Sequence, residues 1–181
     1  SILNIFTRFE NLLTAIKCFG FTKLGSSYMA FGSNLAYQKS EFFKVNGFIN
    51  HMKINTGEDY LFIKDAANNK NTTFCISEDS VIETDTPKSF SKWFTEKKEE
   101  TRIIKKIQFK HRFLLGFFNF SKLFFYVLAV TLLFFYPWKI ILAIILSYFL
   151  VQYIVVGISA KKLKEPQIIF FLPFLEIGLL L

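Results

Sequence analysis

The sequence is poor in the residues that build metal sites and disulfide frameworks. It has two cysteines and two histidines among 181 residues. Cys18 and Cys75 stand far apart in apolar surroundings, which excludes a disulfide framework and the close spacing of metal ligands. We expect both to be buried free thiols. His51 and His111 are equally isolated, and we expect neither to act in catalysis.

Several sequence motifs of common enzyme classes are missing as well. The chain has no glycine-rich phosphate loop, no paired-histidine metal motif and no serine nucleophile elbow. It has no signal peptide, opens without Met and stops within an apolar run. We therefore expect a fragment of a longer protein. Acidic residues are also scarce near the end, since residues 113–181 hold 2 of the 14 Asp and Glu.

Apolar residues are abundant, at 52% of the chain with 25 Phe. Residues 113–136 contain one charge, Lys122, and residues 140–160 contain none. Each run has about the 20 residues that cross a hydrocarbon core. The sequence therefore predicts two membrane spans, followed by a third, truncated one at 168–181. A buried core helix is the alternative for a single run of this kind, and two in series favour the membrane.

Basic residues flank these spans unequally. Nine lie within residues 88–112, three follow the second span at Lys161, Lys162 and Lys164, and Lys139 lies between the spans. The positive-inside rule places both basic segments, and the polar region before them, in the cytoplasm. We expect residues 88–112 to form an amphipathic helix on the anionic inner membrane surface. A nucleic-acid face is the rival explanation, which the position beside a span disfavours.

The polar region combines helical and extended patterns. Residues 2–18 have the apolar spacing of an amphipathic helix, and Ser40 can cap a short helix that ends near Val45. The segments 72–77 and 80–84 are typical of two strands separated by a polar turn. Helices and strands in alternation predict an α/β layer.

The segment Gly57-Glu58-Asp59 opens another predicted helix, which ends at 68–69. Carboxylates in a first helical turn are stabilised by its free N–H groups and by the helix dipole, and that role is purely structural. A carboxylate here could also accept a proton from an alcohol as it attacks an electrophile. Neighbouring helical residues point about 100° apart, so at most one of these two carboxylates can face a common site.

Three segments precede the spans in a fixed order: "GSNLAYQKSEFFKVNGF", "GEDYLFIKDA" and "VIETDTPKSFSKWFTEKK". Together they resemble the C-terminal half of the membrane-anchored family 2 glycosyltransferases of bacteria, over about residues 1–165. The resemblance implies a partial GT-A-type, Rossmann-like α/β catalytic domain at 1–87. It also implies an interfacial amphipathic helix at 88–112 and transmembrane helices at 113–181.

The resemblance further implies an inverting enzyme of the bacterial inner membrane. It would move a sugar from a nucleotide-diphosphate donor to a hydroxyl on a lipid-linked or glycan acceptor, with membrane lipids as further partners. Asp59 would be the general base and Glu58 its neighbour. The residues lining the acceptor side next to the donor diphosphate would be Phe31, Gly32, Ser33, Asn34 and Gly57. Ser33 and Asn34 could instead make turn hydrogen bonds alone.

On the basic helix, the resemblance directs attention to Trp93, Lys97, Lys98 and Arg102. Trp93 and its neighbour Phe94 could form part of the acceptor site or seat the helix on lipid, and the preference of Trp for membrane interfaces favours seating. The family's Gln-x-x-Arg-Trp element should start near Thr95. Here the residues are Glu96-Lys97-Lys98-Glu99-Glu100, and a Lys could replace the missing Arg only as a point charge. Single addition therefore fits better than processive synthesis.

The family's metal-binding Asp-x-Asp is the second departure. It lies upstream of "GSNLAY" in the family, and nothing before residue 28 contains it. Residues 83–85 imitate the pattern but follow the Gly-Glu-Asp segment. The resemblance thus implies Mg²⁺ or Mn²⁺ in the full-length enzyme, with no metal ligands in this chain, which alone should be inactive.

Two other classes compete with this hypothesis. The chain could be a non-catalytic, membrane-anchored structural or assembly subunit in which the acidic helix start is a cap. A transporter is disfavoured because the predicted spans are few and their charges are confined to Lys122 and Glu176.

Overall fold

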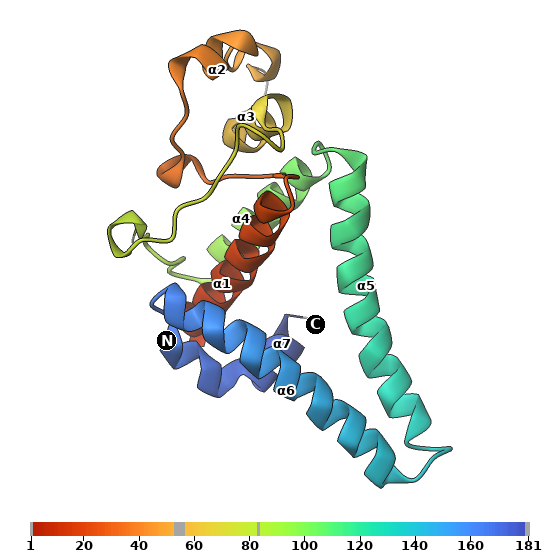
Figure 1. The fold of residues 1–181 in the computed structure, drawn as a ribbon. Coiled ribbons are helices and arrows are strands. Elements are labelled where there is room, and N and C mark those ends of the chain that lie inside the picture. The colour runs from red at the N-terminus through yellow and green to blue at the C-terminus, as the bar shows by residue number, and fades with distance from the viewer. Residues whose placement is uncertain (1, 53–56, 83, 180–181) are drawn as a thin grey trace.

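The computed structural model describes residues 2–52, 57–82 and 84–179, and these residues are 71% helical and contain no strand (Figure 1). The α-helices are α1 (Ile2–Lys23), α2 (Lys39–Lys44), α3 (Glu58–Ala66), α4 (Phe90–Ile104), α5 (Phe109–Leu132), α6 (Trp138–Lys162) and α7 (Leu172–Gly178). Short 3-10 turns form η1 (Gly32–Asn34), η2 (Ile49–His51), η3 (Glu78–Ser80) and η4 (Pro166–Phe171).

The predicted α/β layer, and with it the GT-A-type, Rossmann-like fold, is wrong for this described part of the chain. Among the described residues, neither 72–77 nor 80–82 meets a strand that could pair its backbone groups, and residue 83 of the second predicted strand lies outside the described residues. Local bonds form instead: the N–H of Ser77 donates to Oγ of Ser80 over 3.0 Å and closes η3. Such side-chain bonds compete with strand pairing. Without a sheet to cover it, Cys75 is exposed and not buried as we expected, while Cys18 is half-buried.

The predicted helices are present with shifted ends. α1, α2 and α3 occupy the three segments expected in the polar region. The basic helix α4 starts at Phe90, two residues later than the expected start at 88, because Ser89 caps it: its hydroxyl accepts the N–H of Lys92 at 3.2 Å. The apolar runs form α5 and α6.

α5 and α6 are each long and apolar enough to cross a membrane. The most apolar 18-residue window is 6% buried in α5 and 17% buried in α6, whereas the core helix of a soluble protein buries most of its surface. The third apolar run is η4 followed by α7, from Pro166 to Gly178, and is shorter than a span. Figure 1 shows α5 and α6 joined at one end and diverging toward α1.

Two hydrophobic clusters hold the helices together. In the first, α1 packs against α6, η4 and α7, and its buried members are Phe9, Leu12, Val156, Ala160, Ile168, Leu172 and Leu175. The second joins the loop after α1 to α3 and to the end of α4, through Tyr28, Met29, Tyr60, Ile103 and Ile107. Two apolar residues of the basic helix region that we expected on lipid, Ile103 and Ile107, are therefore buried inside the protein.

Candidate functional site

The site begins at Gly57, where the chain turns into α3. Gly57 has a left-handed backbone with φ 85°, a conformation that costs other residues free energy. A Cβ at this position would lie 2.5 Å from Cδ1 of Ile103 on α4. Glycine thus lets the first turn of α3 approach α4 closely, and this turn carries Glu58 and Asp59.

Asp59 connects this turn to a loop 27 residues earlier in the chain. Its Oδ2 accepts the backbone N–H of Gly32 at 2.6 Å, and its Oδ1 accepts the N–H of Tyr60 at 2.9 Å. An ionised carboxylate offers about four lone-pair sites, so each oxygen can still accept another hydrogen. Glu58 is exposed, and Asp59 is half-buried.

A cleft of about 410 Å³ opens beside this carboxylate. Its polar edge comes from the helix start, and its apolar wall includes two aromatic rings. The lining residues are Gly32, Leu35, Tyr37, Phe48, Gly57, Glu58 and Asp59. We did not single out Tyr37 and Phe48 from the sequence. The resemblance could have pointed to them, because they lie in its "NLAY" and "GF" segments, which precede the Gly-Glu-Asp segment.

A second cleft, of about 310 Å³, lies on the other side of Phe31 and Tyr60 and reaches Trp93 and Lys97. The rings of Phe31 and Tyr60 meet edge to face, with centroids 6.2 Å apart. Burial, with a smaller effect of the nearby Glu100, raises the pKa of Tyr60. Its hydroxyl therefore stays protonated at neutral pH. The predicted site residues are thus divided between two neighbouring clefts.

Trp93 seats α4 on another helix of the protein. Its Nε1 donates to Glu10 of α1 over 3.1 Å, and its ring meets Phe6 edge to face at 5.5 Å. Lys97 reaches the same Glu10 at 3.1 Å and Glu100 at 2.5 Å. The sequence alternatives for Trp93 were lipid and acceptor. The structure instead gives it a contact with α1 and a place on the wall of the second cleft.

The remaining predicted residues lie outside both clefts. Asn34 donates from Nδ2 to the carbonyl of Ser80 at 2.9 Å, a contact with a residue 46 positions later and not the local turn bond that we left open. Ser33, Lys98 and Arg102 are exposed. The two histidines also have local partners: His51 lies 2.7 Å from Asp65 and the buried His111 lies 2.9 Å from Ser26.

The described residues provide no ligand set for the metal that the resemblance implies. Nowhere in the described ranges do three His, Cys, Asp or Glu side chains gather closely enough to hold an ion. No family model, curated protein or solved structure matches this chain.

Proposed function

We propose that this chain supplies the acceptor side of an inverting glycosyltransferase at a membrane, with Asp59 as general base. The observation that carries the proposal is the bond between Asp59 and Gly32. It brings together two segments that resemble family elements, at the edge of a cleft with an aromatic wall. Clefts of this kind, with a few convergent polar groups, are the usual places for small-molecule binding.

In the proposed reaction, the acceptor hydroxyl approaches a free lone pair of the Asp59 carboxylate. The carboxylate takes the hydroxyl proton while the oxygen attacks the anomeric carbon of the donor sugar. The attack comes from the face opposite the leaving nucleoside diphosphate, whose bond to the anomeric carbon breaks with its electron pair, so the configuration at that carbon inverts. Tyr37 and Phe48 offer apolar ring surfaces to the acceptor, and Glu58 lies at the rim. The donor would be held by a part of the enzyme that these residues do not provide.

The membrane side of the proposal rests on α5, α6 and the basic segments. Residues 88–112 and Lys161 to Lys164 lie toward one side of the two candidate spans, and Lys139 lies at the other. The positive-inside rule places the first side, with the clefts, in the cytoplasm of a bacterium. An acceptor that is lipid-linked or that grows at this surface would reach Asp59 from the membrane.

Substitution of Asp59 by Asn tests the proposal. In a protein that carries both this chain and a donor-binding half, Asp59→Asn is expected to abolish sugar transfer while the nucleotide sugar still binds. Loss of a general base costs about 10²–10⁴-fold in rate. The matched control is Asp65→Asn, the same change at the other end of α3, where the side chain contacts His51. Transfer at the wild-type rate by Asp59→Asn would refute the assignment.

A non-catalytic subunit is the second candidate, and one observation favours it. Both oxygens of Asp59 already accept backbone N–H groups, which is the arrangement of a structural clamp. If this is its role, Asp59→Asn should loosen the loop at Gly32 without changing any transfer rate. Sequence upstream without an Asp-x-Asp would also favour this candidate.

A further inference from the structure

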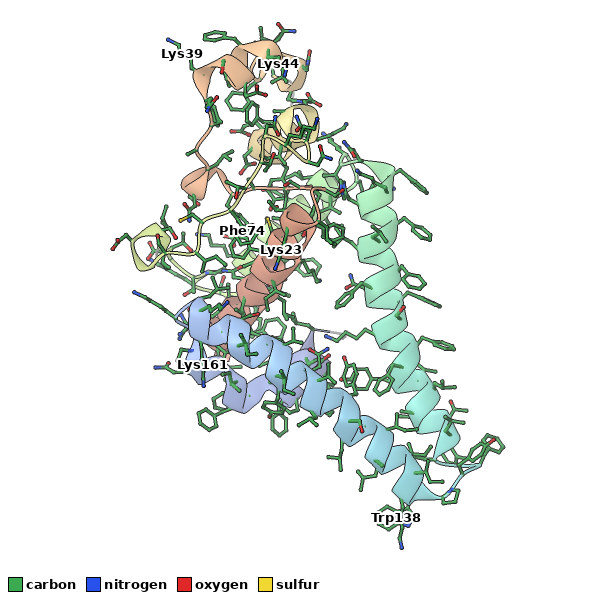
Figure 2. All side chains as sticks on the ribbon, viewed as in Figure 1. Lys23, Lys39, Lys44, Phe74, Trp138 and Lys161 are labelled. Carbon is green, nitrogen blue, oxygen red and sulfur yellow. The ribbon has the colours of Figure 1, made fainter. Side chains whose placement is uncertain are left out.

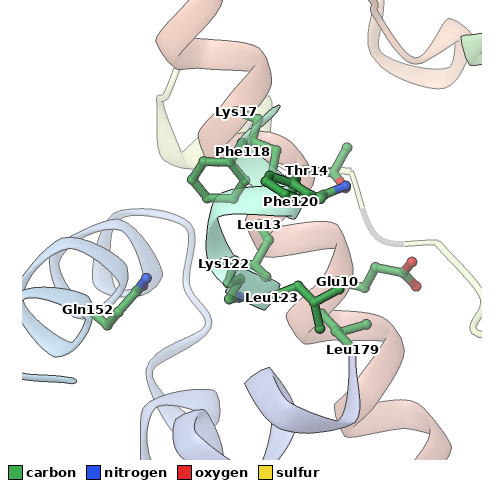
Figure 3. Close-up of a pocket in the computed structure, with 11 residues that line it drawn as sticks. Glu10, Leu13, Thr14, Lys17, Phe118, Phe120, Lys122, Leu123, Gln152 and Leu179 are labelled. Carbon is green, nitrogen blue, oxygen red and sulfur yellow. The ribbon is translucent and has the colours of Figure 1, made fainter. Parts of the chain in front are cut away.

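A cavity of about 440 Å³ lies between α1, α5, α6 and the end of α7, apart from both clefts (Figure 3). α1 contributes one face of the cavity, from Glu10 to Lys17. α5 contributes Asn119 and Lys122 together with apolar side chains, and α6 contributes Gln152. Two ammonium groups and several hydrogen-bonding side chains therefore line one space.

Three ammonium groups and three carboxylates lie in or near this cavity, and two of the ammonium groups form the ion pairs. Lys122 pairs with Glu176 at 2.7 Å, and Lys97 pairs with both Glu10 and Glu100. Lys17 lies 5.1 Å from the centre of the Phe118 ring, but among the described residues no carboxylate forms an ion pair with it. Burial, and next the charge of Lys122, lowers the pKa of Lys17. The charges of Glu10 and Glu100 offset part of this lowering, and an anion in the cavity would offset more of it.

The depth of the cavity in a membrane follows from α5. Backbone hydrogen bonds continue past the helix to Tyr136, an aromatic residue of the kind that marks a membrane interface. Lys122 precedes Tyr136 by 14 residues, or about 21 Å of helix. In a hydrocarbon core about 30 Å thick, Lys122 lies nearer the basic side. Its ammonium group is held at Glu176 at this depth, and the cavity extends from it along α1 to Lys17.

The wall beside the two lysines is apolar and open. Phe118, Phe120 and Leu123 line the cavity on α5, and each is about half exposed or more. In a bilayer these side chains would face acyl chains, while the amides of Asn119 and Gln152 also line the cavity. Ammonium groups beside an apolar wall match a ligand that has an anionic head and a hydrocarbon tail. A small soluble anion matches this cavity less well, because it would not cover the apolar wall.

We propose that this cavity binds the phosphate headgroup of an anionic membrane phospholipid, with Lys17 and Lys122 contacting the phosphate and the acyl chains lying along α5. The site requires α5 and α6 to cross a membrane. It does not require glycosyl transfer, so it stands or falls separately from the role of Asp59.

The test is lipid retention by the purified full chain. Native mass spectrometry from mixed micelles should show more bound phosphatidylglycerol than phosphatidylcholine. Lys17→Gln is expected to lower the affinity for phosphatidylglycerol about tenfold, since charged hydrogen bonds to phosphate are among the strong ones. Lys23→Gln is the matched control: it makes the same change on α1 at an exposed position outside the cavity (Figure 2). Lys17→Arg keeps the charge and should retain binding.

A second variant tests the other lysine without leaving a buried charge alone. Lys122→Gln combined with Glu176→Gln removes the ion pair as a unit, and it should also weaken phosphatidylglycerol binding. Equal retention of both lipids, or wild-type binding by Lys17→Gln, would overturn the proposal. Inorganic phosphate tests the source of the ligand. If it displaces phosphatidylglycerol at similar concentrations, the cavity is a site for free phosphate and the lipid assignment is wrong.

Discussion

Two carboxylates, Asp59 and Glu176, are held in opposite ways. Asp59 is half-buried and accepts two backbone N–H groups from nearby turns. Glu176 is 1% exposed and receives Lys122 from α5 and the Tyr148 hydroxyl from α6, the latter over 2.5 Å. Backbone N–H groups of its own helix and of the loop at Gly32 hold the first, and the packing of three helices fixes the second. Changes in the loops around Asp59 should therefore cost little stability. Loss of either Lys122 or Glu176 from the helical region should cost much more.

The largest expected effect comes from breaking the buried pair. Glu176→Leu leaves Lys122 charged with no carboxylate, and removal of one member of a buried ion pair costs about 3–5 kcal/mol. The free energy of unfolding in mixed detergent, followed by helical circular dichroism, measures this loss. Lys122→Met together with Glu176→Leu should recover most of it. If both variants lose the same amount, the ion pair is not the cause.

A smaller loss is expected where Gly57 meets α4. Gly57→Ala places a Cβ 2.5 to 2.8 Å from three carbons of Ile103 and forces a left-handed backbone. Together these effects should cost about 2–3 kcal/mol in the free energy of unfolding. Ile103→Ala removes the clashing carbons, so the double variant should lose less than the sum of the single losses. Additive losses would mean that the two residues do not press on each other.

The smallest effect concerns Lys17 and pH. Its folded-state pKa is lowered from the ordinary 10.5, mainly by burial, so the unfolded chain binds the proton more tightly. Stability should therefore rise with pH between the lowered value and 10.5, and the unfavourable contribution is fully present below that window. Thermal unfolding in neutral detergent should show this rise in the wild type and not in Lys17→Gln. Anionic lipid should reduce the difference, and an identical pH profile for both proteins would contradict it.

The same contrast explains how much the sequence could predict. The sequence signals for the start of α3 at Gly57 and for the long apolar helices lie within short stretches of the chain. The structure contains these helices. The resemblance assigned Gly32 and Asp59 to one site, but the bond between them was not predicted. The absence of strands could not be read locally, because a strand depends on partners elsewhere in the chain. The hydrogen bond between Ser77 and Ser80 forms a local turn in place of strand pairing, and strand propensity does not predict such a bond.

The helical region shows the other limit of sequence reasoning. Lys122 and Glu176 were recognised as charges inside apolar runs, but their meeting depends on how α5, α6 and α7 pack. Trp93 carried a preference for lipid, and its bond to Glu10 of α1 could not be read from the sequence. Ile103 shows the same effect in the basic helix, where burial against the Gly57 turn replaces the expected contact with the membrane.

The contact of α1 with the last helices has a consequence for folding. Arg8 pairs with Glu165, 157 residues later, and Phe9 and Leu12 join a cluster completed by Ile168 and Leu172. During synthesis, the apolar face of α1 therefore stays exposed until α5, α6 and η4 have been made. Contacts this distant slow folding and leave intermediates open to aggregation. A ribosome stalled before residue 165 should hold α1 accessible to protease, and release of the finished chain should protect it.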